Sequence, residues 1–138
     1  KDKNEIKGTL KINVIDTNGN EIGSDKSINL EYKREYWVNQ VVEEQKIGSI
    51  EGYSFYKAKV SSSPKAEGTV VKRIRFDDEK NQYSSDSGGG WEDIGNNTVY
   101  FIYAKNPTTI MITAIAVLEK IKIIWLILEI IVDMETEQ

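Results

Sequence analysis

The stretch that decides the fold is TLKINVIDTNGNEI, which occupies residues 9–22. Its apolar residues alternate with other residues at the two-residue period of a strand that has one buried face: Leu10, Ile12 and Val14. The dipeptide Asn18-Gly19 follows, and Asn-Gly is the strongest short signal for a β-hairpin because both residues tolerate a positive φ. We therefore predict a first strand that ends at Asp16 and a second strand that returns through Glu21 to about Leu30 or Tyr32.

The same rules predict one short helix and three more strands further along the chain. Valine side chains recur at three- and four-residue spacing within residues 36–46, which is typical of a helix with one buried face. Residues 50–60, 69–76 and 98–104 are rich in β-branched and aromatic side chains and favour strands. The last of these strands places its large side chains on one face: Val99, Phe101 and Tyr103. The pattern predicts an α+β fold that is mainly β.

Two polar stretches separate the later strands. Residues 61–68 carry three serines, a proline and a glycine, so they are predicted to form a loop. Residues 77–97 form the longest polar stretch of the chain, and their tip reads SSDSGGG over residues 84–90. We predict a flexible loop there. Long loops inside compact domains are either functional or disordered, so this loop is a candidate site.

The composition excludes several classes of chemistry. The 138 residues include no cysteine and no histidine, which removes thiol nucleophiles, disulfides, structural zinc and the usual general base. We predict a protein that is not an enzyme and that has no cofactor and no metal site. Asp16, Asn18 and Asn20 have the first spacings of a calcium loop, but Glu21 stands where that loop needs glycine and Ser27 where it needs glutamate.

The charge balance argues against a nucleic-acid partner. The formal net charge is −4, and binding to phosphates needs a basic face. The densest basic patch consists of Lys72, Arg73 and Arg75 within a predicted strand. We interpret this patch as the solvated face of that strand.

The polar loop carries the residues that we predict to bind a ligand, namely Tyr83, Asp86 and Trp91. An aromatic ring at an exposed loop tip beside carboxylates is a common way to stack and hydrogen-bond a sugar. The alternative is that Trp91 folds back into the core and that the glycines before it only form the turn. Both alternatives are open at the level of sequence.

Residues 8–107 also resemble a known family, the MucBP-type repeat of Gram-positive bacterial surface proteins. The resemblance lies in the motifs DTNGNEI (residues 16–22), IEGYSF (residues 50–55) and NTVYFIYAKN (residues 97–106). It implies a β-grasp-like module at the bacterial cell surface, in the cell wall, as one of a series of repeats. It further implies adhesion to a host glycoprotein or glycan, or the spacing of other domains away from the wall, and no catalytic residues.

The C-terminal residues differ sharply from the rest, so we divide the chain into a module over residues 1–107 and an apolar, amphipathic helix with an acidic tail over residues 108–138. Charges within residues 110–132 argue against a simple membrane span. The helix needs a partner surface, which is the sheet of its own domain, a second copy or a membrane interface, and we favour packing or self-association. The seam predicted for a homo-oligomer consists of Leu118, Ile121, Trp125, Leu128 and Val132.

Overall fold

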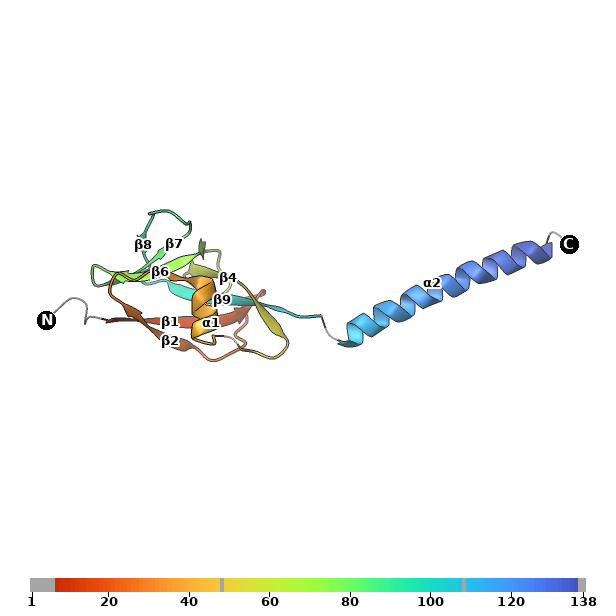
Figure 1. Cartoon of the computed structure of the whole chain (residues 1–138), viewed down its shortest axis with the longest axis horizontal. Helices are drawn as coiled ribbons and strands as arrows, with labels where there is room; N and C mark the ends of the chain where they lie inside the picture. The colour runs from red at the N-terminus through yellow and green to blue at the C-terminus, as the bar shows by residue number, and fades with distance from the viewer. Residues whose placement is uncertain (1–6, 48, 108, 137–138) are drawn as a thin grey trace. The chain divides into compact units, whose positions relative to one another are not determined.

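The computed structural model describes residues 7–47, 49–107 and 109–136. It divides the chain into two compact units, a body of Lys1–Lys105 and a C-terminal unit of Asn106–Gln138. Among the described residues the fold is α+β and mainly β, as predicted, with two helices and two sheets (Figure 1). The body contains β1 (Lys7–Asp16), β2 (Lys26–Glu31), β3 (Tyr36–Trp37), α1 (Val38–Glu44), β4 (Tyr53–Ser61), β5 (Thr69–Val71), β6 (Arg73–Asp77), β7 (Lys80–Ser84), β8 (Glu92–Asp93) and β9 (Thr98–Lys105). The C-terminal unit contains α2 (Thr109–Thr136).

The larger sheet has the strand order β2-β1-β9-β4-β5, and its two central strands, β1 and β9, run parallel. The predicted hairpin forms, although β2 starts at Lys26 and Glu21 makes only an isolated bridge to Ile15. The Asp16 carboxylate holds the turn, because it accepts the backbone N–H of Asn20 at 2.9 Å and that of Asn18 at 2.8 Å. The bond from Asn20, followed by the other amide bonds, lowers the pKa of Asp16.

The smaller sheet has the order β3-β6-β7-β8, and it corrects two of our predictions. Residues 69–76 are not one strand. The chain changes sheets at Lys72, whose N–H donates to the Ser84 carbonyl at 2.9 Å and whose carbonyl accepts the N–H of Val38 at 3.0 Å. Residues 77–97 are not one long loop either, because β7 and β8 lie within them and pair with each other.

The hydrophobic core joins one face of the larger sheet to α1 and to the inner face of the smaller sheet. Helix α1 crosses in front of β1 and β9 in Figure 1, and its Val38 and Val41 are buried. The alternation predicted for the first and last strands is confirmed, since their inward side chains all belong to this core: Leu10, Ile12, Val14, Val99, Phe101 and Tyr103. On the opposite face Ile15, Tyr100 and Ile102 form a small second cluster.

Tyr103 makes the stability of the body sensitive to alkaline pH. Its side chain is 2% exposed, and burial raises its pKa to about 12. Between pH 10 and about 12 the unfolded chain therefore loses this proton while the folded chain keeps it, so that stability falls as the pH rises. We expect Tyr103 to account for about 1.4 kcal/mol of that fall at pH 11. Urea unfolding at pH 8 and pH 11 checks this value.

Tyr103→Phe is the matched control for the alkaline transition. The variant loses the hydrogen bond from the Tyr103 hydroxyl to the Ile47 carbonyl, which costs about 1 kcal/mol at pH 8, where the folded and unfolded chains both keep the proton. Its free energy of unfolding should nevertheless fall less than that of the wild type between pH 8 and pH 11. Equal losses in the two proteins would show that other groups cause the transition.

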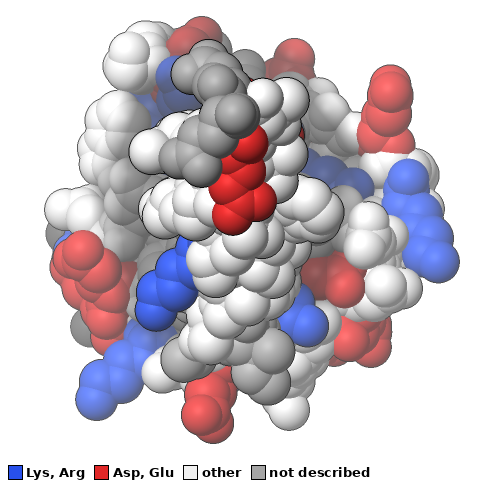
Figure 2. Space-filling view, turned by 90° about the vertical axis from the view of Figure 1, so that its right-hand side faces the viewer, with Lys and Arg blue, Asp and Glu red and all other residues white. Residues whose placement is uncertain are grey.

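Helix α2 is exposed from Met111 onward. Every side chain from Met111 to Thr136 is exposed, and apolar side chains also lie on the half of the helix that carries most charges: Ile123, Leu126 and Ile130. The predicted amphipathic division is therefore only partial. Figure 2 views the helix from its C-terminal end and shows a mostly white surface with isolated charged side chains. Within the described residues, no helix has both the length and the apolar character needed to cross a membrane.

Candidate functional site

The three residues predicted to bind a ligand, Tyr83, Asp86 and Trp91, lie around one small pocket of about 230 Å³. Tyr83 belongs to β7, whereas Asp86 and Trp91 belong to the segment between β7 and β8. The pocket is completed by Ser85, Gly90 and Glu92. The fold thus brings the predicted residues together, because pairing of β7 with β8 closes the glycine-containing segment into a tight connection.

The polar groups of this pocket already bind one another. The Tyr83 hydroxyl donates to the Glu92 carboxylate at 2.7 Å, and this bond, together with burial, raises the pKa of Tyr83. The Asp86 carboxylate accepts the N–H of Gly88 at 2.8 Å and the Ser84 hydroxyl at 3.2 Å. A ligand would have to replace such bonds, each of which contributes about 1 kcal/mol.

Trp91 lies against two arginines rather than at a free loop tip or in the core. The guanidinium carbon of Arg73 is 4.6 Å from the centroid of its ring, and that of Arg75 is 4.3 Å away. The ring is half-buried and does not belong to the main hydrophobic core. Trp91 therefore covers a cationic surface of β6, held there by cation–π attraction.

Arg73 is the centre of this surface, and it corrects our interpretation of the basic patch as solvated. The residue is 4% exposed. Its guanidinium donates to the Glu35 carboxylate at 3.2 Å, to the Ser84 hydroxyl at 3.0 Å and, through Nε, to the Asp86 carbonyl at 3.1 Å. The Trp37 ring also lies beside it, at 5.5 Å. Arg73 thus links two tryptophan rings that are far apart in the sequence.

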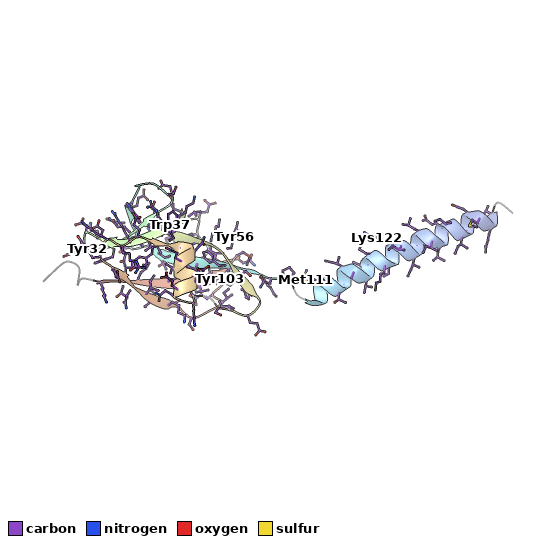
Figure 3. The ribbon with its side chains drawn as sticks, in the orientation of Figure 1. Tyr32, Trp37, Tyr56, Tyr103, Met111 and Lys122 are labelled. Carbon is purple, nitrogen blue, oxygen red and sulfur yellow. The ribbon has the colours of Figure 1, made fainter. Side chains whose placement is uncertain are left out.

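A second surface, which the sequence did not indicate, carries exposed aromatic rings. A groove of about 280 Å³ is lined by the start of α1 together with β4 and β5. Its walls include Trp37, Tyr56 and Val70, which are 42%, 60% and 41% exposed. We call it the Trp37–Tyr56 groove, and Figure 3 labels both of these aromatic residues. Large apolar side chains that share an exposed groove are typical of a binding surface.

A β-bulge places Tyr56 in the groove. In the pairing of β4 with β9, Phe55 lies opposite Tyr103 and Lys57 lies opposite Ile102, so that Tyr56 has no partner in the ladder. A bulge of this kind redirects a side chain without ending the strand. Phe55 before the bulge packs against the core, whereas Tyr56 is turned outward.

Polar side chains surround the aromatic rings of the groove. Lys57, Lys72 and Asn39 also line it. Both lysines are exposed, and neither takes part in the ion pairs formed among the described residues. The Lys57 ammonium lies 5.2 Å from the centroid of the Tyr56 ring. The groove therefore combines surfaces for stacking with donors that a ligand can use.

A larger cavity of about 550 Å³ lies beside β1 and the residues that precede β9. It is lined by several asparagines and lysines, and no aromatic ring is among its described lining residues. The side-chain oxygens of Asn13 and Asn81 have no hydrogen-bond partner within the described part of the chain. The cavity can hold water or small polar molecules, but it has no ring on which the apolar face of a ligand could stack.

No metal centre is formed by the residues that the structure describes, since no three acidic side chains gather there. Comparison of the chain with protein-family models, with curated proteins and with solved structures gives no match.

Proposed function

We propose that the body is a non-catalytic binding module that recognises a glycan or glycoprotein at the surface of a Gram-positive bacterium. The Trp37–Tyr56 groove is the observation that carries this proposal. Exposed aromatic rings stack against the apolar faces of sugar rings, and neighbouring amide and ammonium groups bind sugar hydroxyls. Trp37 belongs to β3 directly before α1, and Tyr56 lies at the bulge within β4, so the folded backbone holds both rings in place before a ligand arrives.

The strand order supports the further proposal of a MucBP-like β-grasp body. In the larger sheet the first and last strands are parallel neighbours at the centre, each is flanked by an antiparallel strand, and α1 lies between β2 and β4 in the sequence. This is the arrangement expected of a β-grasp. The smaller sheet is then an addition to it, built from β3 and from residues that follow β5.

A glycan array tests the proposal. We expect the wild type to bind a subset of glycans, and Trp37→Ala and Tyr56→Ala each to bind them about tenfold more weakly, because each loses one stacking surface. Tyr56 has no partner in the β-ladder, so its replacement should not alter the fold. Circular dichroism of each variant verifies this before binding is measured.

Trp91→Ala is the matched control, because it removes an aromatic ring from the pocket around Tyr83 and none from the lining of the groove. The groove is the site if Trp91→Ala binds like the wild type. Loss of binding in Trp91→Ala alone would move the site to that pocket, as the sequence suggested. If the wild type binds no glycan on the array, the glycan proposal is contradicted. The function that then replaces it is the spacing of other domains away from the cell wall.

A second candidate function is self-association through α2, and a specific observation favours it. The helix exposes large apolar side chains along its whole described length, among them Trp125, Leu128 and Met134. Surfaces of this kind are rare on soluble monomers and mark sites of contact. The residues predicted for the seam lie on one side of the helix at spacings of three and four residues, which suits packing between helices.

A further inference from the structure

We infer that α2 packs against α2 of a second copy of this chain in the antiparallel orientation. The inference rests on the self-association proposed above, and it adds the direction of the partner helix and the charges that select it. It depends on the seam of Leu118, Ile121, Trp125, Leu128 and Val132 and on two charged residues beside that seam.

Lys122 and Glu129 flank the seam on the same side. Lys122 directly follows Ile121, and Glu129 directly follows Leu128, so the two charges lie two helical turns apart on one face. Lys122 projects away from the helix in Figure 3. Within its own helix it pairs only with Glu119, at 3.3 Å, and both side chains are well exposed. None of the ion pairs among the described residues includes Glu129.

The antiparallel orientation brings these opposite charges together. When Trp125 packs level with Leu128 of the second copy, Ile121 packs level with Val132, so that the seam is in register from residue 121 to residue 132. Leu118 lies beyond these layers, level with Glu135 of the second copy. Lys122 then lies within about 3 Å, measured along the helix axis, of the level of Glu129 of the second copy. Because the pair is symmetric, the same contact forms twice, and charges that flank a seam select the orientation of the partner.

The parallel orientation offers these charges no partner. In a parallel pair in register, Lys122 faces Val117 of the second copy, and Glu129 faces Ile124. Along the helix axis, Lys122 would lie at the same height as Lys122 of the second copy, and Glu129 at the same height as Glu129. The distribution of charge on the described helix therefore favours the antiparallel pair.

An antiparallel pair leaves part of the apolar surface uncovered. Ile123, Leu126 and Ile130 lie on the side of α2 that faces away from the seam, and all three are more than half exposed. A second pair can cover these side chains. We therefore expect assemblies with an even number of copies, of which the antiparallel pair is the unit.

Disulfide trapping tests the orientation, because the chain has no cysteine of its own. Ile121→Cys and Val132→Cys are made separately in the full chain. In the antiparallel pair, residue 121 of one copy is level with residue 132 of the other, whereas identical positions lie about 16 Å apart along the axis. A disulfide needs Cα atoms within about 7 Å. The mixture of the two variants should therefore cross-link rapidly, and each variant alone should not.

Charge reversal tests the role of Lys122 and Glu129 independently of cross-linking. Lys122→Glu and Glu129→Lys should each weaken association roughly tenfold in sedimentation velocity, because each replaces two attractions with two repulsions. The double variant K122E/E129K restores opposite charges across the pair and should associate like the wild type. A parallel pair would show no such rescue.

The outcomes separate this inference from the proposal on which it rests. Residues 1–105 carry their own core and serve as the monomeric reference. A full chain that sediments as a monomer would overturn self-association itself, and binding of that monomer to phosphatidylcholine vesicles would identify a bilayer as the occupant. A full chain that associates but cross-links through identical cysteines would overturn only the antiparallel orientation.

Discussion

Arg73→Ala should lower the free energy of unfolding by about 3 kcal/mol. The side chain of Arg73 is 5% exposed and donates three hydrogen bonds. Hydrogen bonds that involve a charged group contribute about 1.5 to 3 kcal/mol each. Part of the lost stability is regained, because the Glu35 and Asp86 carboxylates that pair with Arg73 are 47% and 63% exposed and become hydrated once Arg73 is removed. Urea unfolding at neutral pH measures the difference.

Arg75→Ala is the control for this prediction, since Arg75 also stacks on Trp91. Its guanidinium makes one side-chain hydrogen bond, to Gln82 at 2.9 Å, and an ion pair with Asp77. We expect a loss of about 1 kcal/mol. Tryptophan fluorescence should shift to longer wavelength in Arg73→Ala, because two rings lose the same neighbour. Equal destabilisation by the two variants would show that Arg73 does not organise this surface.

Gly68→Ala should lower the free energy of unfolding by about 2 to 3 kcal/mol, the upper part of the range of about 1 to 3 kcal/mol found for overpacked sites. A Cβ atom at this position would lie 2.2 Å from the Val60 carbonyl oxygen and 2.8 Å from the Ser61 Cβ. The obstacle is backbone, so it cannot rotate away. The preceding loop cannot yield freely either, because Lys59 donates to the carbonyl oxygens of Pro64 and Ala66 at 2.7 and 2.9 Å.

Gly89→Ala is the matched glycine control. No atom lies within 4 Å of a Cβ placed at Gly89, and we expect a change below about 0.5 kcal/mol. The two variants are compared by thermal and urea unfolding. Because Gly68 directly precedes β5, Gly68→Ala should also distort the edge of the Trp37–Tyr56 groove and reduce any glycan binding. Stability equal to that of the wild type would mean that the β4–β5 edge is looser than its contacts indicate.

The strands that could be predicted are those whose side chains alternate between a buried face and an exposed face. Leu10, Ile12 and Val14 mark β1 by this period, and β9 is marked in the same way. β7 could not be found from the sequence, because its residues KNQYS are mostly polar and one of its faces carries hydrogen-bonded polar groups. The turn between β6 and β7 carries no sequence signal for a hairpin either. Asp78 and Glu79 adopt φ values of 51° and 57°. An Asn-Gly pair at these two positions would have predicted the turn.

The residues of the predicted pocket could be chosen from the sequence because glycines and an aromatic ring stand together in one loop. The groove could not, because Trp37 and Tyr56 lie on elements that meet only in the folded chain. Alternation after Tyr53 and Phe55 does turn Tyr56 outward, but no sequence signal marks the bulge that turns Lys57 outward beside it or brings Tyr56 next to Trp37. The burial of Arg73 was missed for a related reason, since its partners come from two segments far apart in the sequence, Glu35 and residues 84–86.

The bulge at Tyr56 separates the chemistry of recognition from the stability of the body. A residue outside the hydrogen-bonded ladder and 60% exposed to solvent can be exchanged for another aromatic, polar or charged residue while the ladder and the core stay unchanged. If the groove binds the ligand as proposed, substitutions at this one position can change the ligand preference. Variants that differ only at residue 56 could then differ in what they bind and still share one scaffold of nearly constant stability.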